Sequence, residues 1–402
     1  MPRTSSISDA PHRVRSALLA ALVAGAFACS SADPSAPDAA ALDGGFAVDA
    51  EAPPDAGSAP DADVPAPDAG PAADAARPTL ASLSPTWTST FGNPVLRGRR
   101  IDLWGSIAVV EGRNLYLFGG NGYPNGAAME RHWVMSLDDG AWTELAPGPA
   151  RRYCHCATLL PDTREILLVG GRNDRAPIDG DAWVYAIDAD TWTRVEGDVP
   201  PAPIGCVAAW MPNFPGGGRA IVFGGDGFQG VSQATWAFDP SARRFTALSP
   251  ATSPPARRDP MMAFDPGAGG AGRLVLFGGS RSVQPPVALD DTWAFDGTTW
   301  SELAVGADRP SPRRYAASAF MPEHRYWVLF GGTNDVASSD ELWAFDATID
   351  RWRRLPAADP TPTGRGFAMM SWDAMTSSFL LLGGIRFENY VDVKRGWQLR
   401  VW

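Results

Sequence analysis

The fold prediction rests on the stretch Leu274-Val275-Leu276-Phe277-Gly278-Gly279, because the chain repeats its pattern. A short apolar run ends in a Gly-Gly pair, and such a run, bounded by glycine, is typical of a buried strand. Gly-Gly pairs of this kind stand at 119–120, 170–171, 224–225, 278–279, 331–332 and 383–384. Their spacings of 51, 54, 54, 53 and 52 residues are close to constant, which indicates a repeat architecture.

Each repeat contains more than the Gly-Gly strand. A tryptophan follows the first glycine by 12 to 15 residues, at Trp133, Trp183, Trp236, Trp293, Trp343 and Trp397. A second aromatic residue follows in five repeats, at Trp142, Trp192, Phe245, Trp300 and Trp352. A further strand, such as 152–157, precedes the Gly-Gly strand. Four strands per repeat form a sheet that cannot bury both faces alone, and packing the copies around an axis solves this problem. We expect the tryptophans to fill the core between the copies.

These residues resemble the kelch repeat. The shared features are the Gly-Gly pair after the second strand, the spaced aromatic residues and a Pro-x-x-Arg lead-in, as in Pro149-Ala150-Arg151-Arg152 and Pro255-Ala256-Arg257-Arg258. The resemblance covers about residues 85–402 and recurs six times. It implies an all-β fold, a six-bladed kelch-type β-propeller over residues 80–402.

The two ends of this domain complement each other. The last repeat ends at 397–402 and leaves no room for a fourth strand. Pro85-Thr86-Trp87-Thr88 resembles the fourth-strand sequence Thr191-Trp192-Thr193, so we predict that residues 84–91 complete the last blade. Pairing the termini in this way removes exposed sheet edges.

The N-terminus predicts export. Arg3, Arg13 and Arg15 form a positive region, an apolar run follows at 17–27, and small residues precede Cys29. This run is too short for a permanent transmembrane helix. Ala26-Phe27-Ala28-Cys29 resembles the lipobox of bacterial lipoproteins, although Ala26 and Phe27 depart from its preferred residues. We therefore predict a signal peptide over 1–28 and lipidation of Cys29, with an ordinary secretory signal as the alternative.

Residues 29–79 form an Asp/Ala/Pro-rich segment that we predict to be a disordered linker. Residues 30–78 have a net charge of −9 within a chain of −11, and few bulky apolar residues. Such a segment cannot bury enough apolar area to offset its ordering entropy. The remaining chain, 79–402, is only weakly acidic and shows no basic stripe, so we expect no nucleic-acid partner. The predicted location is a bacterial cell envelope, in the periplasm or at the outer membrane or cell surface, with membrane contact through the lipid anchor only.

One face of the predicted ring is rich in arginine. In antiparallel blades, the loops after Gly-Gly and the Pro-x-x-Arg lead-ins share a face, and loops on a rigid scaffold commonly form binding sites. The candidate ligand-binding residues are Arg100, Arg152, Arg172, Arg258, Arg281, Arg314, Arg365, Arg386 and Asn334. Arginine is suited to bidentate capture of carboxylates. The alternative is structural: an arginine at a repeated position ties blades together through backbone carbonyls, or through Asp181 and Asp291.

Cysteines in an exported protein suggest a disulfide. Cys154 and Cys206 each lie five residues after a proline of neighbouring repeats, so a Cys154–Cys206 bridge is favoured over Cys156–Cys206, with free buried thiols as a further alternative. His155 points away from Cys154 and Cys156 in a strand, which argues against a zinc or copper site. We assign no metal, cofactor or catalytic residue.

The resemblance implies a non-catalytic binding or scaffold module, because kelch propellers commonly serve as interaction platforms. The expected partner is a protein, an acidic glycan or a small anion at the Arg-rich face, and we expect a monomer. The alternative is an exported carbohydrate-active enzyme of the sialic-acid epimerase type. A galactose-oxidase-like copper enzyme is less favoured, since it needs a Tyr, Cys and His cluster and the chain has four His and seven Tyr.

The predicted closure is testable by truncation. Deleting residues 80–92 is expected to destabilise the whole ring, because the last blade then loses its outer strand and exposes an edge. A thermal melt of the shortened protein measures this effect. A melting temperature equal to that of the intact chain would disprove the closure.

Overall fold

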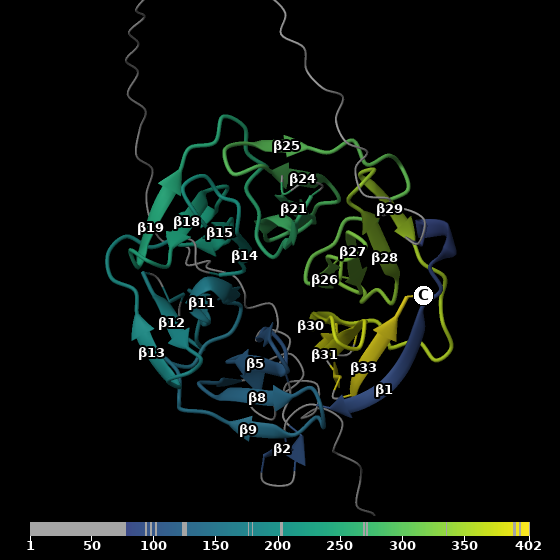
Figure 1. Cartoon of the computed structure of the whole chain (residues 1–402), viewed down its shortest axis with the longest axis horizontal. Helices are drawn as coiled ribbons and strands as arrows, with labels where there is room; N and C mark the ends of the chain where they lie inside the picture. The colour runs from purple at the N-terminus through teal and green to yellow at the C-terminus, as the bar shows by residue number, and fades with distance from the viewer. Residues whose placement is uncertain are drawn as a thin grey trace, which may run out of the picture. The chain divides into compact units, whose positions relative to one another are not determined.

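The computed structural model describes residues 78–401 except 93–94, 97–98, 101–102, 123–126, 176, 179, 202–203, 268–269, 271, 335, 389–390 and 394. Six sheets, each built on four antiparallel strands, surround one axis (Figure 1). The chain is therefore an all-β, six-bladed propeller, as the repeats predict. The predicted signal peptide, Cys29 and the linker up to residue 77 lie outside the described residues.

The strands of each blade are named here from the axis outward. Blade 1 consists of β4 (Ile107–Glu111), β5 (Asn114–Phe118), β8 (His132–Ser136) and β9 (Trp142–Glu144). Blade 2 consists of β10 (Cys156–Leu160), β11 (Glu165–Val169), β12 (Ala182–Ala186) and β13 (Thr191–Arg194). Blade 3 consists of β14 (Val207–Met211), β15 (Arg219–Phe223), β18 (Thr235–Asp239) and β19 (Arg244–Leu248).

The second half of the ring has the same order. Blade 4 consists of β20 (Met261–Asp265), β21 (Arg273–Phe277), β24 (Thr292–Phe295) and β25 (Trp300–Glu302). Blade 5 consists of β26 (Ala317–Met321), β27 (Tyr326–Phe330), β28 (Leu342–Asp346) and β29 (Arg351–Arg354). Blade 6 consists of β30 (Gly366–Asp373), β31 (Ser378–Arg386), β33 (Arg395–Arg400) and, from the start of the domain, β1 (Thr86–Gly92).

Blade 6 closes the ring. Strand β1 pairs antiparallel with β33, with Trp87 opposite Leu399 and Thr88 opposite Gln398 (Figure 1). The predicted closing strand is confirmed, displaced slightly from 84–91 to 86–92. A short 3-10 helix, η1 (Leu80–Ser82), precedes it. The edge of β33 is therefore covered by the N-terminal strand of the same domain.

The Gly-Gly pairs make the contacts between blades. The first glycine of each pair has φ between 61° and 75°, and the second between 88° and 99°, conformations that favour glycine. In the pairs described, the second glycine donates its N–H across the blade junction over 2.8–3.0 Å: Gly120 to Arg152 O, Gly225 to Arg257 O, Gly279 to Arg313 O, Gly332 to Arg365 O and Gly384 to Leu103 O. A Cβ on the first glycine of these pairs would lie only 2.3–2.7 Å from the same carbonyl oxygens, so no other residue fits there.

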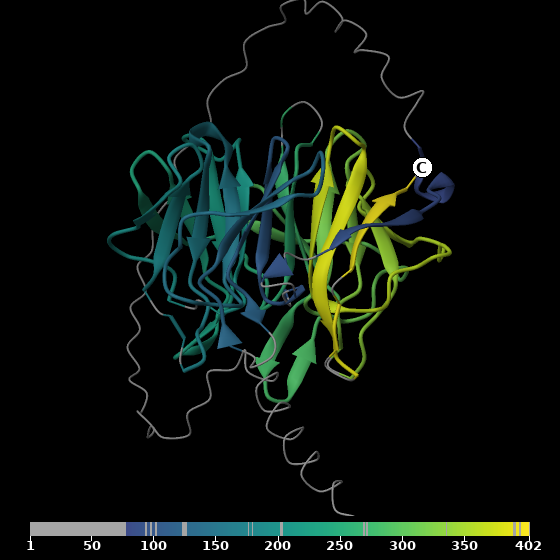
Figure 2. The same ribbon diagram turned by 90° about the horizontal axis from the view of Figure 1, so that it is seen from below.

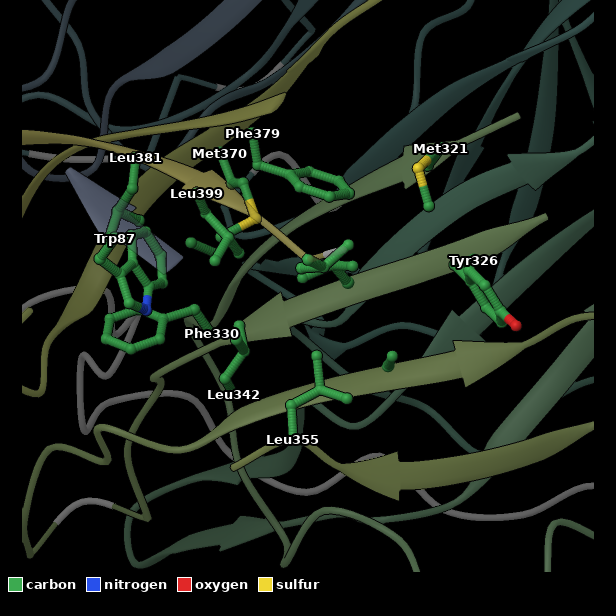
Figure 3. Close-up of a cluster of buried hydrophobic side chains, with 14 of the residues drawn as sticks. Trp87, Met321, Tyr326, Phe330, Leu342, Leu355, Met370, Phe379, Leu381 and Leu399 are labelled. Carbon is green, nitrogen blue, oxygen red and sulfur yellow. The ribbon is translucent and has the colours of Figure 1, made fainter. Parts of the chain in front are cut away.

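The core lies between blades. Buried side chains from facing sheets form one cluster at each junction, and the cluster between blades 5 and 6 is drawn in Figure 3. There Trp87 from β1 packs edge-on against Phe330 of β27, with ring centroids 5.2 Å apart. Trp300 and Trp327 are among the largest fully buried side chains, as expected for core residues.

Among the described residues, ion pairs on the face opposite the Gly-Gly loops join four of the junctions, and the one between blades 2 and 3 is made by Arg243 and Glu165. The last residue of an inner strand is acidic in blades 1, 4 and 6, and it pairs with an arginine of the next blade: Glu111 with Arg164, Asp265 with Arg325 and Asp373 with Arg113. Arg325 holds the fully buried Asp265 through two bonds of 2.8 Å. These bonds raise the pKa of Arg325. The same strand position is apolar and fully buried in the other three blades, at Leu160, Met211 and Met321.

Small hairpins project from the Gly-Gly loops. They are β6 (Asn121–Gly122) with β7 (Ala127–Ala128), β16 (Asp226–Gly227) with β17 (Gly230–Val231), and β22 (Ser280–Val283) with β23 (Pro286–Ala288). Strands β2 (Val95–Leu96) and β3 (Arg99–Arg100) form another hairpin, and β32 (Val391–Asp392) pairs with β31. The blade-4 hairpin extends beyond the body of the ring (Figure 2, green). The only other helix described is η2 (Pro161–Thr163), and no described helix has the length and apolarity needed to span a membrane.

Candidate functional site

Six residues form a ring around the axis on the Gly-Gly side. Each immediately precedes or lies near the start of the inner strand of its blade, and each has φ between 54° and 66°: Gly105, Cys154, Gly205, Asp259, Tyr315 and Phe367. Backbone N–H groups donate to neighbouring members around the ring, from Cys154 to Gly105 O, Gly205 to Cys154 O, Asp259 to Gly205 O and Phe367 to Tyr315 O. We call these six residues the axial ring. Because every blade contributes one residue to this ring, the six repeats can be aligned on it.

Two residues before the axial ring, four blades carry a buried arginine. These inner arginines are Arg152, Arg257, Arg313 and Arg365, with exposures of 0%, 0%, 2% and 1%. Each donates from Nη1, over 2.9–3.3 Å, to the carbonyl of the first glycine in the Gly-Gly pair of its own blade. Their backbone carbonyls accept from the Gly-Gly pair of the preceding blade, so one residue connects two pairs.

An acidic residue completes this arrangement in three blades. Asp181, Asp291 and Glu341 accept from the inner arginine and also from the indole N–H two residues further along. Burial lowers the pKa of Arg365, which has no such acidic partner among the described residues, to about 10. Arg152 and Arg365 were predicted to bind a ligand, whereas the structure places both guanidinium groups in the junctions, buried and hydrogen-bonded within the fold. Their contacts match the alternative interpretation, in which a repeated arginine connects blades through backbone carbonyls and acidic residues.

The prediction also placed the arginines in the wrong register. Counting from Pro149 and Pro255 made Arg152 and Arg258 equivalent, whereas the axial ring makes Arg152 equivalent to Arg257. The repeat of blade 4 contains Pro254-Pro255, and the first of the two prolines is the matching one. In blade 1 the matching residue is Leu103, whose carbonyl accepts from Gly384, rather than Arg100. Arg100 lies in β3, and its side chain lies outside what the structure describes.

Arg258 and Arg314 directly precede the axial ring and meet at Asp259. Arg258 donates to Asp259 Oδ2 over 2.7 Å and lies 3.3 Å from Asp226, and Arg314 lies 3.6 Å from the same Asp259 oxygen. Arg258 and Asp226 are buried at 1% and 0% exposure. Burial opposes the charge of Arg258, yet the two carboxylates prevail and raise its pKa. The structure therefore brings two predicted arginines together, but as partners of buried acids.

Aromatic rings lie beside this ionic cluster. Tyr315 stacks on Phe367 with centroids 3.6 Å apart, and Phe387 lies parallel at 5.8 Å from Phe367. The Arg314 guanidinium lies 4.7 Å from the Tyr315 ring centre, a cation–π distance. Burial raises the pKa of Tyr315, whose hydroxyl bonds to Asp259. Blades 4 to 6 thus supply large side chains to the axis, whereas blades 1 to 3 supply Gly105, Cys154 and Gly205.

The remaining predicted residues do not converge. Arg172 is mostly buried, with its guanidinium 5.8 Å from the Tyr153 ring centre. Arg281 is exposed on β22, and Arg386 is half exposed and 3.8 Å from Glu388. Asn334 Oδ1 accepts from the backbone N–H groups of Val336 and Ala337, so it shapes its own loop. Among the predicted residues whose side chains the structure describes, Arg281 and Asn334 are the exposed ones.

The disulfide joins Cys156 to Cys206, with Cα atoms 5.7 Å apart, and so links the inner strands of blades 2 and 3. The predicted Cys154–Cys206 bridge is wrong. Cys154 is in the axial ring, where the equivalent residue of blade 3 is Gly205, and Cys206 lies one residue beyond it. Among the residues that the structure describes, no three His, Cys, Asp or Glu side chains gather as metal ligands would.

Sequence reasoning missed Asp226, Asp259, Tyr315 and Phe367. The available signal was the column of residues that follows the lead-in, which has small residues in blades 1 to 3 and Asp259, Tyr315 and Phe367 in blades 4 to 6. This column becomes visible only when the repeats are aligned on the positive-φ position.

Comparison with known proteins agrees with this geometry. The family model described as the KLHDC2/KLHL20/DRC7 Kelch-repeats domain matches residues 105–296 and 164–384. The chain belongs to this kelch-repeat family. The matched residues cover the axial ring and all six Gly-Gly pairs.

Curated relatives contain this kelch region as a part. The tRNA wybutosine-synthesizing protein 4 of Eremothecium gossypii is 28% identical over 231 residues, 53% of this chain and 30% of that protein. The flagellar outer-arm dynein alpha chain of Chlamydomonas reinhardtii is 26% identical over 310 residues, 70% of this chain and 6% of that protein. Adagio protein 3 of Arabidopsis thaliana is 25% identical over 310 residues, 71% of this chain and 47% of that protein. The kelch chain spans less than half the length of each.

The structural and surface arginines differ in their expected effect on stability. Arg257→Met should lower the free energy of unfolding by about 3–5 kcal/mol, because Asp291 would stay partly buried without its cation. Arg281→Met, on the exposed hairpin, should change it by less than about 0.5 kcal/mol. Urea titrations of both variants measure the difference. Equal stabilities would contradict the role assigned to the inner arginines.

Proposed function

We propose that this kelch propeller is a non-catalytic binding module that docks a protein partner on its Gly-Gly face. The kelch propeller fold supports a binding or scaffold function in general, but the fold alone does not identify the site. The argument for this face therefore rests on the residues that it presents to solvent.

The observation that carries the proposal is the set of exposed tips on this face. Phe228, between β16 and β17, is 71% exposed, and Val336, in the loop after Gly331-Gly332, is 79% exposed. Between these two blades, the projecting β22–β23 hairpin exposes Arg281. Aromatic residues and arginine are enriched in protein interfaces and at their energetic centres. Apolar tips flanking an arginine favour a partner that offers apolar side chains and an acidic residue.

The centre of the face favours a protein over an anion. Arg258 and Arg314 are engaged with Asp259 and Asp226, so their charge is compensated within the fold. An acidic glycan or a small anion would need cations that are available to it. The same pairing gives no support to the epimerase-type enzyme, which would use a free carboxylate facing arginines, and no observation favours the galactose-oxidase-like alternative.

The docking face can be tested against a matched surface. Ile349 and Met375 are also apolar and 59% and 73% exposed, but they lie on turns of the opposite face. The full chain, the variant Phe228→Asp/Val336→Asp/Arg281→Glu and the control Ile349→Asp/Met375→Asp would each be cross-linked in an envelope extract of the source cells. A partner identified by mass spectrometry would then be purified, and its Kd measured by calorimetry.

We expect the face variant to weaken binding of that partner at least tenfold, while the control variant binds like the original chain. Circular dichroism would establish that both variants are folded. Unchanged binding by the face variant, equal loss in the control, or an acidic glycan or small anion as the bound species would each refute docking of a protein at this face.

We further propose that the propeller is exported and tethered to a cell envelope through a lipid on Cys29. The n-region, the apolar run and the lipobox-like sequence support this, and the acidic 30–78 segment has the composition of a spacer. The Cys156–Cys206 disulfide is compatible with an oxidising compartment. The propeller would then be held by its N-terminus. One acyl chain alone gives only marginal membrane binding, so stable anchoring needs a second signal.

Replacement of one residue tests the tether. In a bacterial host given a radioactive or alkyne fatty acid, the original chain should acquire label and enter the membrane fraction. The variant Cys29→Ala should lose the label and appear in the soluble fraction, and Cys154→Ala serves as the control for the loss of a cysteine. A label that persists in the Cys29→Ala variant would exclude this site.

A further inference from the structure

Two histidines depart from the repeat, and both lie in the junction between blades 1 and 2 (Figure 1). His132 is the first residue of β8, whereas the equivalent strands of blades 3 and 4 begin with Thr235 and Thr292. His155 directly follows the axial ring, where the other five blades have a small residue or a proline: Ser106, Cys206, Pro260, Ala316 and Ala368. Both departures place a titratable ring in the same junction.

The two rings are buried in an aromatic cluster. His132 and His155 are 2% and 3% exposed. The ring centre of His132 lies 4.3 Å from that of Tyr185 and 5.2 Å from that of Trp192. The ring centre of His155 lies 5.7 Å from that of Phe118. These side chains come from both blades, so the histidines are part of the contact that holds blade 1 against blade 2.

Hydrogen bonds satisfy the two rings only in part. Within the part of the chain that the structure describes, neither nitrogen of His155 has a hydrogen-bond partner, and the same holds for Nδ1 of His132 and Nε1 of Trp192. In the junctions of blade 3 with blade 4 and of blade 4 with blade 5, the equivalent indole N–H groups of Trp300 and Trp352 donate to the threonine hydroxyls over 3.0 Å. The junction between blades 1 and 2 lacks this bond, and no described carboxylate bonds to its histidines.

The charged groups around the rings give little compensation for a proton. Arg152 adds a positive charge beside His155, and Asp190 is the acidic group that faces His132. The Asp190 carboxylate already accepts from the Tyr185 hydroxyl over 2.9 Å and from the backbone N–H of Ala146. Burial raises the pKa values of both tyrosines of the cluster, Tyr116 and Tyr185, so their hydroxyl groups are neutral as well.

Burial therefore decides the charge of both rings. It lowers the pKa of His132 to about 4, against the attraction of Asp190 and a contact with the backbone of Ala146. It lowers the pKa of His155 to about 3, and the charge of Arg152 acts in the same direction. Near neutral pH both histidines are uncharged.

The junction has no room for a counter-ion. A cavity of about 10 Å³ is lined by both histidines and by Trp192, which is at most about the space of one water molecule. Strands β4, β10 and β11 contribute only apolar side chains to its wall: Ile107, Val109, Ala157, Ile166 and Leu168. A protonated ring can therefore gain an anion or a hydration shell only if blades 1 and 2 move apart, because a buried charge without a partner is unfavourable.

We propose that the junction between blades 1 and 2 is an acid-sensitive seam, at which the ring opens when His132 and His155 take up protons. Other junctions have contacts that keep them closed in mild acid. The Cys156–Cys206 disulfide holds blades 2 and 3, and the ion pair of Arg325 with Asp265 holds blades 4 and 5. The seam is separate from the exposed tips of the docking face, so it stands or falls independently of the protein partner.

Acid should act in a defined pH range. A histidine in the opened junction has a pKa of about 6.5, above both values in the closed ring. The stability that the neutral rings contribute is fully present above about pH 6.5 and is lost as the pH falls toward about 4 and 3. Between about pH 5.5 and 4.5, opening should take up about two protons, so its equilibrium constant should rise about 100-fold.

Hydrogen exchange read by mass spectrometry tests the seam in the full chain. Protection factors, corrected for the pH dependence of intrinsic exchange, would be measured at about pH 7.5, 5.5 and 4.5 for peptides of every blade. In the variant His132→Gln/His155→Gln, the amides cannot titrate in this range. The control His324→Gln removes a histidine from a turn of blade 5. If circular dichroism shows the double variant to be unfolded at neutral pH, the two single variants replace it, and each should show about a tenfold rather than a 100-fold change.

We expect protection in blades 1 and 2 to fall about 100-fold between the two lower pH values in the original chain and in His324→Gln, while blades 4 and 5 keep theirs. In the double variant, protection of blades 1 and 2 should not change over this range. The proposal is overturned if the original chain keeps its protection in blades 1 and 2 at the lowest pH, if all six blades lose protection together, or if the histidine variants lose it as the original chain does.

Discussion

Close contact between the backbones of neighbouring blades is the constraint on which the ring depends. The second glycine of a Gly-Gly pair donates to a carbonyl of the next blade, and the first glycine lies too near that carbonyl to carry a Cβ. Where the residue bearing the carbonyl is an inner arginine, its side chain returns to the Gly-Gly pair of its own blade. Each junction therefore fixes the position of the next blade as well as its own. A ring built this way needs glycine at both positions because the backbone must approach and have positive φ.

This constraint also explains why the arginines of the lead-ins are poor ligand-binding candidates. An arginine that can reach the Gly-Gly carbonyl is carried into the junction, where its charge is buried and compensated by Asp181, Asp291 or Glu341. The arginines one residue later face the axis, and there Asp226 and Asp259 compensate them. A face that looks basic in the sequence is thus largely neutral at its centre. What remains for a partner is the set of exposed tips.

The six blades are alike in their strands but differ where they meet the axis. The hydrogen-bonded backbone of the axial ring has the same conformation in all six blades, so its side chains can vary without changing the fold. Blades 1 to 3 have small residues in the axial ring, whereas blades 4 to 6 have Asp259, Tyr315 and Phe367 there. The fold is therefore a property of the repeat, whereas the side chains at the axis are a property of individual blades.

The sequence by itself determined the number of blades, the order of strands and the closure by residues near 86–92. These follow from local signals, because strand period, glycine pairs and recurrent tryptophans are repeated six times and errors in one copy are corrected by the others. Only the tertiary structure decided which arginine lies in a junction, that Cys156 rather than Cys154 bonds to Cys206, and that Asp226, over thirty residues before Asp259 in the chain, lies beside Arg258. A doubled proline, as at Pro254-Pro255, shifts the apparent register of the repeat by one residue. A shift of one residue changes which side chain is assigned to the junction and which to the axis. Such a shift is invisible in spacing alone and is settled by the backbone contacts between blades.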